Sequence, residues 1–406
     1  MILFLNFAPI EFMGGAEKWM NETAKRINNQ EHSTLVSVDK SISSIYSSLV
    51  LDRKFDSRAN SKDIHNHTSL DIQCFFPFTS KWFKTRELFK NSRLIYARYE
   101  VPEFFILLYF AGLPGLKKTI AGLHSPFIYT FPETFFEKLH NKIYQSHLSK
   151  KILSTVKKIH VMNKSNLKFF SKHHKFDNVV YVPNSTKPQN STTTIMQDNK
   201  LHILFVGELS KRKGVDRLIS VIKNSPENYI FTLAGDGPLK DKVEALTQTH
   251  YNCIYKGHVD SNSMSSLYKS NEILFLPSRA ESMPLSILEA LSFGLTIVDS
   301  NEITLDLDKN IEFSSKNNTT EDYLKVLKKI EKNTIPQILP CEHCLKLPHD
   351  ANHAHTSTPH TLKARFGAKE RSVLQNCRNF SAFVFRFSRS FVFFRACFRS
   401  AHMHLR

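Results

Sequence analysis

The chain has 406 residues, with 12 Gly, 16 Pro, 41% hydrophobic and 23% charged residues, a globular composition that excludes disordered, collagen-like and low-complexity proteins. At roughly 150 residues per domain, this length predicts two domains. The formal net charge of +18 favours anionic partners, namely phosphorylated substrates, acidic lipid head groups or nucleic acid.

No stretch of the sequence reaches the ~18 apolar residues that a membrane-spanning helix needs. The longest candidate, residues 104–116, is interrupted by Gly112, Pro114 and Gly115. The N-terminal residues MILFLNFAPIEF lack a basic region and carry polar residues early, so we do not interpret them as a secretion signal. We therefore expect a cytoplasmic protein.

The first half alternates short apolar runs with longer amphipathic stretches, which is typical of a parallel sheet with helices on both faces. The stretch 16–28 has Trp19, Met20, Ala24 and Ile27 at helical spacing. We expect strands at 1–7, 33–38, 93–97, 118–123, 158–162 and 179–182, and helices at 16–28 and 102–111.

The polar segment 185–200 predicts a linker between domains, after which a second alternation begins. Pro284 at the first helical position and Gly294 just past the end delimit one of its helices. We expect strands at 201–206, 229–234, 253–256, 272–276 and 296–299, and helices at 215–223, 239–246, 264–269, 284–293 and 320–332. The expected domains are 1–185 and 201–340, joined by the linker 186–200.

The composition changes at residue 341. Residues 341–406 hold eight Arg, three Lys, four of the six Cys and seven of the 19 His. Three interpretations stay open for this atypical basic tail: a non-native or disordered extension, a basic arm for nucleic acid or membrane, and a zinc site. The zinc ligands would be Cys341, Cys344, His349, His353 and His355. A single CxxC with irregular His spacing is a weak zinc signal, so we expect no metal site.

In doubly wound sheets, ligands bind at the carboxyl ends of strands, where loops and helix N-termini meet. The loop 207–214, GELSKRKG, places three cations beside main-chain N–H groups, which suits a pyrophosphate. A solvated basic loop is the alternative. The glycines of 235–238, GDGP, allow close approach of a ligand but also make ordinary turns. This segment is not GxGxxG, so we infer no nicotinamide cofactor.

The segment 281–290, ESMPLSILEA, places Glu281 in a loop and Glu289 on the helix that follows. Main-chain N–H groups of Ser282 to Leu285 lie at the start of that helix, where an anion is favoured. A carboxylate on so apolar a helix needs a partner, and sugar hydroxyls are suitable donors. A surface position for Glu289 is the alternative.

Two features of the first half are weaker signals. Gly14 and Gly15 leave room for a ligand and Glu17 lies at a helix start, although a simple turn would look the same. His124, at a strand end, can hydrogen-bond a sugar or a developing charge, whereas a structural histidine is the commoner case.

Taken together, these segments resemble the retaining glycosyltransferases of the GT-B fold, glycosyltransferase family 4 (group 1). The specific segments are VGELSKRKGVDRLI (206–219), LAGDGP (233–238), GHV (257–259) and SRAESMPLSILEALSFGLTIV (278–298). Glu281 and Glu289 match the E-x7-E element of the family. GGAE (14–17), His124 and VPNS (182–185) match the weaker pattern of the first half, so the resemblance covers about residues 1–335.

The resemblance implies an α/β protein with two doubly wound, Rossmann-like domains facing across a cleft. It implies transfer of a sugar from a nucleotide-diphosphate donor with retention and without a metal. Lys213 would pair with the diphosphate, Glu289 would hold the ribose hydroxyls, and Glu281 would position the donor sugar. The implied donor-binding residues are Gly207, Lys213, Gly235, Gly237, His258, Val259, Ser282, Met283, Pro284, Leu285 and Glu289.

The implied catalytic residues are Glu281 and His124, with an acceptor-binding region at Gly14, Gly15 and Glu17. No cofactor other than the donor substrate is implied. The expected partners are a nucleotide sugar and a glycan or lipid-linked acceptor, and not nucleic acid. The basic charge and the apolar segment 104–116 are consistent with docking on an anionic membrane surface, with a buried helix as the alternative.

The sequence departs from the family pattern in two places. Glu208 stands where the family often has Arg, so Lys211 or Arg212 would have to substitute. The usual glycine pair after Val298 is absent, and the tail stands where the family's closing segment would be.

The expected function is hexosyl transfer in bacterial surface polysaccharide synthesis, including lipopolysaccharide. One alternative is a damaged or truncated transferase-like protein that binds nucleotide without turnover. Another is a nucleotide-sugar epimerase or a phosphorylase on the same architecture. The paired glutamates and the lack of a nucleic-acid motif disfavour a nucleic-acid binder.

Overall fold

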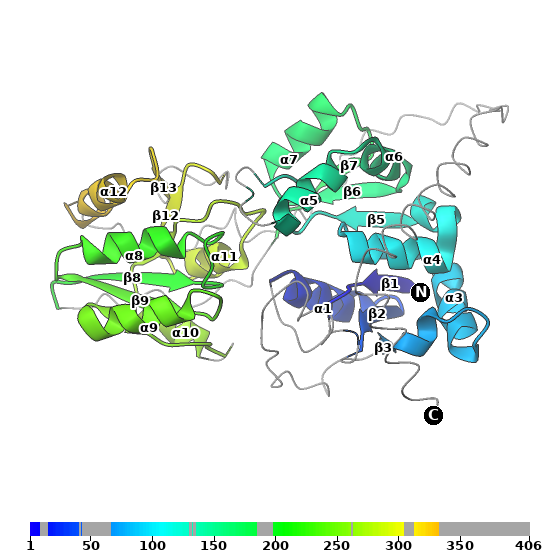
Figure 1. The fold of residues 1–406 in the computed structure, drawn as a ribbon, viewed down its shortest axis with the longest axis horizontal. Helices are drawn as coiled ribbons and strands as arrows, with labels where there is room; N and C mark the ends of the chain where they lie inside the picture. The colour runs from blue at the N-terminus through cyan, green and yellow to red at the C-terminus, as the bar shows by residue number, and fades with distance from the viewer. Residues whose placement is uncertain are drawn as a thin grey trace. The chain divides into compact units, whose positions relative to one another are not determined.

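The computed structural model of the protein describes residues 1–8, 15–39, 42, 66–129, 132, 135–184, 198–260, 263–303 and 312–332. In this part of the chain there are two parallel β-sheets, each flanked by helices (Figure 1). The predicted tail with its Cys and His residues lies outside the described residues, as do Gly14 and most of the predicted linker.

The first sheet has seven strands in the order β3-β2-β1-β4-β5-β6-β7, all parallel. Its first strand, ILFL, is buried at every position, as expected of a central strand covered on both faces. The strands are β1 (Ile2–Leu5), β2 (Ser33–Val38), β3 (His67–Leu70), β4 (Leu94–Arg98), β5 (Thr119–Gly122), β6 (Lys158–Val161) and β7 (Val179–Tyr181).

The helices of this first half connect successive strands. They are α1 (Gly15–Asn28), α3 (Ser80–Asn91), α4 (Val101–Lys117), α5 (Phe135–Tyr144), α6 (His147–Thr155) and α7 (Lys164–Lys168), with short turns η3 (Ile72–Phe75) and η4 (Phe169–His173). On one face, Met20 and Ala24 of α1 pack against Ile2, Phe4 and Leu35.

The second sheet has six parallel strands in the order β10-β9-β8-β11-β12-β13. The strands are β8 (Leu201–Val206), β9 (Tyr229–Ala234), β10 (Cys253–Tyr255), β11 (Ile273–Leu276), β12 (Thr296–Ser300) and β13 (Glu312–Ser315). The helices are α8 (Val215–Lys223), α9 (Lys240–Thr249), α10 (Met264–Lys269), α11 (Leu285–Ser292) and α12 (Thr320–Lys332). The order of strands along the sheet reverses between β8 and β11, which is where such sheets bind ligands.

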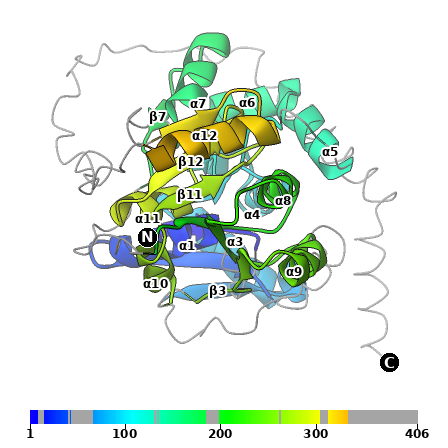
Figure 2. The ribbon, with the colours of Figure 1, turned by 90° about the vertical axis from the view of Figure 1, so that its left-hand side faces the viewer.

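Alternating side chains of β8 divide the core of this sheet into two layers. Ile203 and Phe205 face α8, α9 and α12, whereas Leu204 faces α10 and α11. Helix α12 contacts α8, so the last described helix returns to the first helix of this half (Figure 2). Both faces of the sheet are therefore covered, as the apolar strands predict.

The expected elements agree best with the structure in the second half, where β8, α8, β9, α10 and α12 have the expected limits. The sequence analysis missed β3, α3, α5, α6, α7 and β13. Strands β3 (HTSL) and β13 (EFSS) are short and largely polar, so they lack the apolar run that marks a strand. Pro284 caps α11 in an extended conformation and is not its first helical residue, which corrects the expected start.

Helix α4 contains the apolar segment considered for membrane docking. It continues to Lys117 with a kink at Gly112, where φ is 64°. Phe104, Leu107 and Phe110 are buried, at 5%, 0% and 1% exposure. This segment is core, as the alternative interpretation held. Among the described residues, no helix combines the length and the apolar character needed to cross a membrane.

A buried charge cluster lies where β1 and β4 end. Arg98 is paired with Glu17 of α1 and lies 4.0 Å from Glu103 of α4. Glu103 is 2% exposed and accepts a hydrogen bond from the main-chain N–H of Phe7, at 3.1 Å. Burial raises the pKa of Glu103 to about 7, against the opposing effect of Arg98.

Gly214 lies between the loop 207–214 and α8, with φ at 71° in the left-handed region. A side chain there would overlap the carbonyl oxygen of Pro277, at the end of β11. Gly257 also has a left-handed φ, 65°, but a side chain there would meet nothing within 4 Å. A comparison of the two glycines therefore distinguishes the cost of a left-handed backbone from the cost of a close contact.

We expect Gly257→Ala to lower the free energy of unfolding by ~1–2 kcal/mol, the cost of a left-handed L-residue. Gly214→Ala should cost a further ~1–3 kcal/mol, because the Pro277 carbonyl must move. Urea unfolding of both variants checks this. Equal losses would mean that the packing of Gly214 against Pro277 contributes nothing.

For Glu103, the raised pKa means that the folded state holds the proton more tightly than the unfolded state. The resulting stabilisation is complete below pH 4.5 and is lost as the pH rises through about 7. Glu103→Gln cannot ionise, so between pH 4.5 and 8 it should gain ~3 kcal/mol relative to the natural protein, which corresponds to a pKa difference of about 2.5. Urea unfolding at both pH values measures this. Glu87→Gln, at an exposed position of α3, is the control, and parallel pH profiles for all three proteins would contradict the expectation.

Candidate functional site

The loops that follow the strands of the second sheet are joined by main-chain hydrogen bonds. The N–H of Gly235, after β9, donates to the carbonyl of Gly257, after β10, at 2.8 Å. The N–H of Arg279, after β11, donates to the carbonyl of Arg212, after β8, at 2.9 Å. The predicted loops therefore form one connected surface at the carboxyl edge of the sheet.

Gly235 has a structural requirement beyond an ordinary turn. Its φ is 144°, and a side chain there would overlap the carbonyl oxygen of Gly207, after β8. The N–H of Gly207 in turn donates to the carbonyl of Ala234, at 3.0 Å. The stem of Lys213 lies over Gly207, about 3.8 Å from where a side chain would begin. These glycines thus let two loops and a lysine pack together.

Two cations and two carboxylates form a cluster between the loops after β8 and β11. Lys213 Nζ lies 2.5 Å from Glu281 Oε1, and these side chains are only 14% and 8% exposed. Arg212 lies 3.0 Å from Glu208 Oε2 and 3.7 Å from Glu281 Oε1. Two of the three cations predicted in this loop are therefore already paired, and the four formal charges cancel.

The start of α11 is fixed by asparagine and serine contacts with the first half of the chain. Asn163 donates to the carbonyl of Ser282 at 2.9 Å, and Asn184 donates to the carbonyl of Met283 at 2.9 Å. The Ser282 hydroxyl donates to the carbonyl of Leu123 at 3.2 Å. The loop that holds Glu281 therefore has little freedom to move.

Glu289 has two partners rather than a free surface position. Its Oε1 accepts from Lys18 Nζ of α1 at 2.9 Å, and its Oε2 accepts from the hydroxyl of Tyr268 at 2.9 Å. The Glu289 side chain is 25% exposed, so it is neither fully buried nor fully solvated. The expectation that a carboxylate on this apolar helix needs partners is met within the chain.

His124 lies beside an aromatic group at the end of β5. Its Nε2 is 3.0 Å from the hydroxyl of Tyr96, and that hydroxyl is 2.7 Å from Nδ1 of His160. The ring of Trp19 packs on His124 with 4.8 Å between ring centroids. Burial, the charge of Arg98 and then His160 hold the pKa of His124 well below its usual value. The imidazole is therefore neutral at physiological pH.

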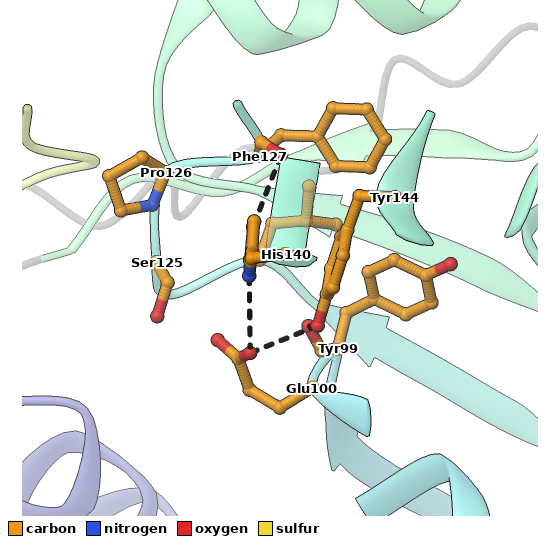
Figure 3. A pocket seen from close by; sticks show the side chains of 8 residues that line it. Tyr99, Glu100, Ser125, Pro126, Phe127, His140 and Tyr144 are labelled. Carbon is orange, nitrogen blue, oxygen red and sulfur yellow. Dashed lines mark hydrogen bonds and ion pairs between the residues drawn. The ribbon is translucent and has the colours of Figure 1, made fainter. Parts of the chain in front are cut away.

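A small pocket is lined in part by Ser125, the residue that follows His124 in sequence (Figure 3). Glu100 accepts from the hydroxyl of Tyr144 at 2.9 Å and lies 4.0 Å from Nδ1 of His140. The His140 ring stacks on Tyr144 with 3.8 Å between centroids. Burial lowers the pKa of His140, opposed by the charge of Glu100. The loop Ser125–Phe127, which directly follows His124 in sequence, lines one side of this pocket. The Glu100 carboxylate and the His140 imidazole line the same pocket.

The remaining predicted residues have varied positions. Glu17 is 8% exposed and paired with Arg98. Its carboxylate is therefore already engaged and is not open to the acceptor substrate. Gly15 lies at the start of α1, about 3.9 Å from Leu285 when measured from an added Cβ. His258 is exposed, whereas Val259 packs against the core layer of α10 and α11. Within the described ranges, no group of three or more His, Cys, Asp or Glu could hold a metal ion.

The sequence analysis missed residues that contact the predicted ones, among them Lys18, Tyr96, Arg98, His160, Asn163 and Tyr268. Some signals were present. Lys18 follows directly after the GGAE segment, and His160 is a polar residue within the buried strand KIHV. A polar side chain in a buried strand needs a hydrogen-bond partner. The sequence indicates that such a partner exists, but only the folded structure shows which residue it is.

Comparisons with known proteins support the group expected from sequence. Residues 187–338 match the family model described as glycosyl transferases group 1. The chain is similar to an uncharacterized 41.2 kDa protein in the cps region of Klebsiella pneumoniae, 35% identical over 111 residues that cover 27% of this chain and 30% of that protein. It is also similar to alpha-galactosylglucosyldiacylglycerol synthase of Streptococcus pneumoniae, 29% identical over 135 residues that cover 29% and 36%. The chain thus spans about a third of the length of these relatives.

Among solved structures, the chain is similar to HepE of Anabaena in complex with UDP and glucose, with a TM-score of 0.64 and 14% identity. The match covers 85% of this chain and 95% of that one. At this identity the likeness concerns the fold, and it confirms the two-sheet GT-B architecture expected from the sequence. Residues 187–338 therefore match the family model of glycosyl transferases group 1, and the chain has a GT-B fold.

Proposed function

We propose that the protein is a retaining glycosyltransferase of family 4 that moves a hexosyl group from a nucleotide-diphosphate sugar to a glycan or lipid-linked acceptor. The observation that carries the proposal is the Lys213–Glu281 pair, 2.5 Å apart in the group 1 region, with Glu289 eight residues further along. A cation, a positioned carboxylate and a second carboxylate match the three parts of an activated sugar: diphosphate, sugar and ribose.

The paired charges suggest how the donor would bind. A diphosphate brings at least two negative charges to a cluster whose own charges cancel, so it would compete with Glu281 for Lys213. Displacement from Lys213 would leave the Glu281 carboxylate able to accept hydrogen bonds from sugar hydroxyls. Arg212, 3.0 Å from Glu208, would supply the second cation at the diphosphate. It would substitute for the Arg that the family often has at the position of Glu208.

Glu289 would hold the ribose hydroxyls through its exposed edge. Lys18 and Tyr268 already orient the carboxylate and limit its rotation, which lowers the entropic cost of binding. The loops that contain Gly235, Gly237 and Gly257 would border the nucleotide. HepE, which shares the fold, is described in complex with UDP and glucose, and this supports a uridine or similar nucleotide as the donor base.

The acceptor would bind the first half of the chain, near Gly14, Gly15 and His124. The carboxylate of Glu17, engaged by Arg98, would shape this region rather than contact the acceptor. The Streptococcus relative is named as a glycolipid synthase, which supports a lipid-linked acceptor. We propose that the reaction takes place on the cytoplasmic side of the membrane, in surface polysaccharide or lipopolysaccharide synthesis. We also propose that the first domain ends at residue 185 and the second begins at residue 201.

Nucleotide binding tests the donor site. We expect UDP or GDP to bind without added metal, and Lys213→Ala and Glu289→Ala to weaken that binding roughly tenfold to a hundredfold, the effect of losing a hydrogen bond to a charged group. Isothermal titration calorimetry measures this. Lys240→Ala is the matched control, because Lys240 is a cation of the same half that pairs only with Glu244 on its own helix among the ion pairs of the described residues. Equal affinity in all variants would reject the assignment.

The stereochemistry of the product tests retention. We expect mass spectrometry with a panel of nucleotide sugars to identify a transferred hexose, and NMR of its anomeric proton to show the configuration of the donor. Glu281→Gln should bind nucleotide but transfer roughly a hundredfold more slowly, because a positioned charge is lost. An inverted product would contradict the proposal. Free sugar without acceptor would favour an epimerase or phosphorylase, and binding without product would favour a transferase-like protein without turnover.

A further inference from the structure

A series of hydrogen bonds runs from His124 to Val182, which follows the edge strand β7 of the first sheet. His124 Nε2 lies 3.0 Å from the hydroxyl of Tyr96 on β4. The same hydroxyl lies 2.7 Å from Nδ1 of His160 on β6. His160 Nε2 lies 2.8 Å from the carbonyl oxygen of Val182, just after β7. Four neighbouring strands therefore supply one continuous series.

The last member of this series fixes where the hydrogens lie. A carbonyl oxygen can only accept, so Nε2 of His160 must carry a hydrogen. A neutral imidazole has one N–H group, so Nδ1 of His160 has a lone pair and accepts from the Tyr96 hydroxyl. That hydroxyl has then used its only hydrogen, and its oxygen accepts from Nε2–H of His124. The remaining nitrogen of His124, Nδ1, is left with a lone pair.

The surroundings keep both histidines neutral, as this assignment requires. His160 is 5% exposed, and burial lowers its pKa despite the hydrogen bond to Val182. The pKa of His124 is held low by burial and by the charge of Arg98. Burial also raises the pKa of Tyr96, so its hydroxyl keeps its proton.

Packing holds the three rings in this arrangement. Trp19 of α1 lies against all of them, with ring centroids 5.3 Å from Tyr96, 4.8 Å from His124 and 5.6 Å from His160. Gly122 of β5 makes room for the Tyr96 hydroxyl, because a side chain at this position would overlap it. The hydroxyl therefore has a fixed place between the two imidazoles.

We propose that Tyr96 and His160 are positioning residues that fix His124 in the tautomer with its proton on Nε2, so that Nδ1 accepts a hydrogen bond from a sugar hydroxyl. The sugar as partner rests on the proposed function, whereas the tautomer rests on the hydrogen-bond series alone. No interaction of Nδ1 of His124 with another described residue occupies this nitrogen.

The consequence is a choice between the two roles open to a histidine at this position. A neutral ring with its lone pair on Nδ1 recognises a hydroxyl that donates. It does not donate to a phosphate or a carbonyl oxygen through that nitrogen. The opposite role would need a second proton on His160 or a reversal of the whole series, and burial disfavours the charge.

The tautomers can be measured without substrate. The experiment uses the full chain with ¹⁵N-labelled histidine at pH 7, with signals assigned by their loss in His124→Gln and His160→Gln. We expect both residues to show a protonated Nε2 and an unprotonated Nδ1. A proton on Nδ1 of His124, or on both nitrogens of His160, would overturn the proposal.

A matched pair of variants tests the role of Tyr96. Tyr96→Phe should move the His124 signals toward a mixture of tautomers, because Nε2–H loses its acceptor. Tyr99→Phe is the control, since its hydroxyl is also buried and lies 2.6 Å from Ser149 Oγ but is not part of the series. A His124 spectrum unchanged in Tyr96→Phe would exclude Tyr96 as the positioning residue.

Kinetics then separate this proposal from the proposed function. With the donor found by the nucleotide-sugar panel, Tyr96→Phe should lower kcat/KM roughly threefold to tenfold, the worth of one hydrogen bond, and leave UDP affinity unchanged. Tyr99→Phe should keep kcat/KM. Normal kcat/KM in Tyr96→Phe would overturn the role of the series in transfer. If the natural protein transfers no sugar, the proposed function fails, and the tautomer measurement still decides the assignment.

Discussion

The ion pair between Lys213 and Glu281 is the interaction on which the candidate site depends. It joins the loop after β8 to the loop after β11, at the point where the strand order of the second sheet reverses. Both side chains are largely buried, so removal of Glu281 would leave the Lys213 charge without this partner. In the proposed function, this pair would offer its cation to a diphosphate and its carboxylate to a sugar.

Glycine makes this arrangement possible. The loops after β8 and β9 approach so closely that the carbonyl of Gly207 occupies the place of a side chain at Gly235. Gly214 does the same against the end of β11. A positive φ at these positions would strain any other residue, so the segments recognised as motifs are also packing requirements. Chemistry and packing cannot be separated at these positions.

Buried polar groups at the carboxyl edge of the first sheet act in a comparable way. Arg98 pairs with Glu17, and its charge opposes the rise that burial causes in the pKa of Glu103. The Tyr96 hydroxyl lies between His124, just after β5, and His160 on β6. Glu17, Arg98, His124 and His160 are far apart in sequence, yet neighbouring parallel strands bring their ends to one edge. The first half therefore has a polar centre that alternating apolar runs alone would not suggest.

The sequence by itself determined the α/β class, the strands with strong apolar runs such as β2, β8 and β9, and the loops in which the charged residues lie, because hydrophobic period and glycine position are local properties. It missed the polar edge strands β3 and β13, whose pairing depends on neighbours rather than on their own composition. Only the tertiary structure decided that Glu289 meets Lys18, 271 residues away in sequence, and that Lys213 is already paired. Such partners are set by the distance between side chains in the folded chain, and the linear pattern does not contain that distance.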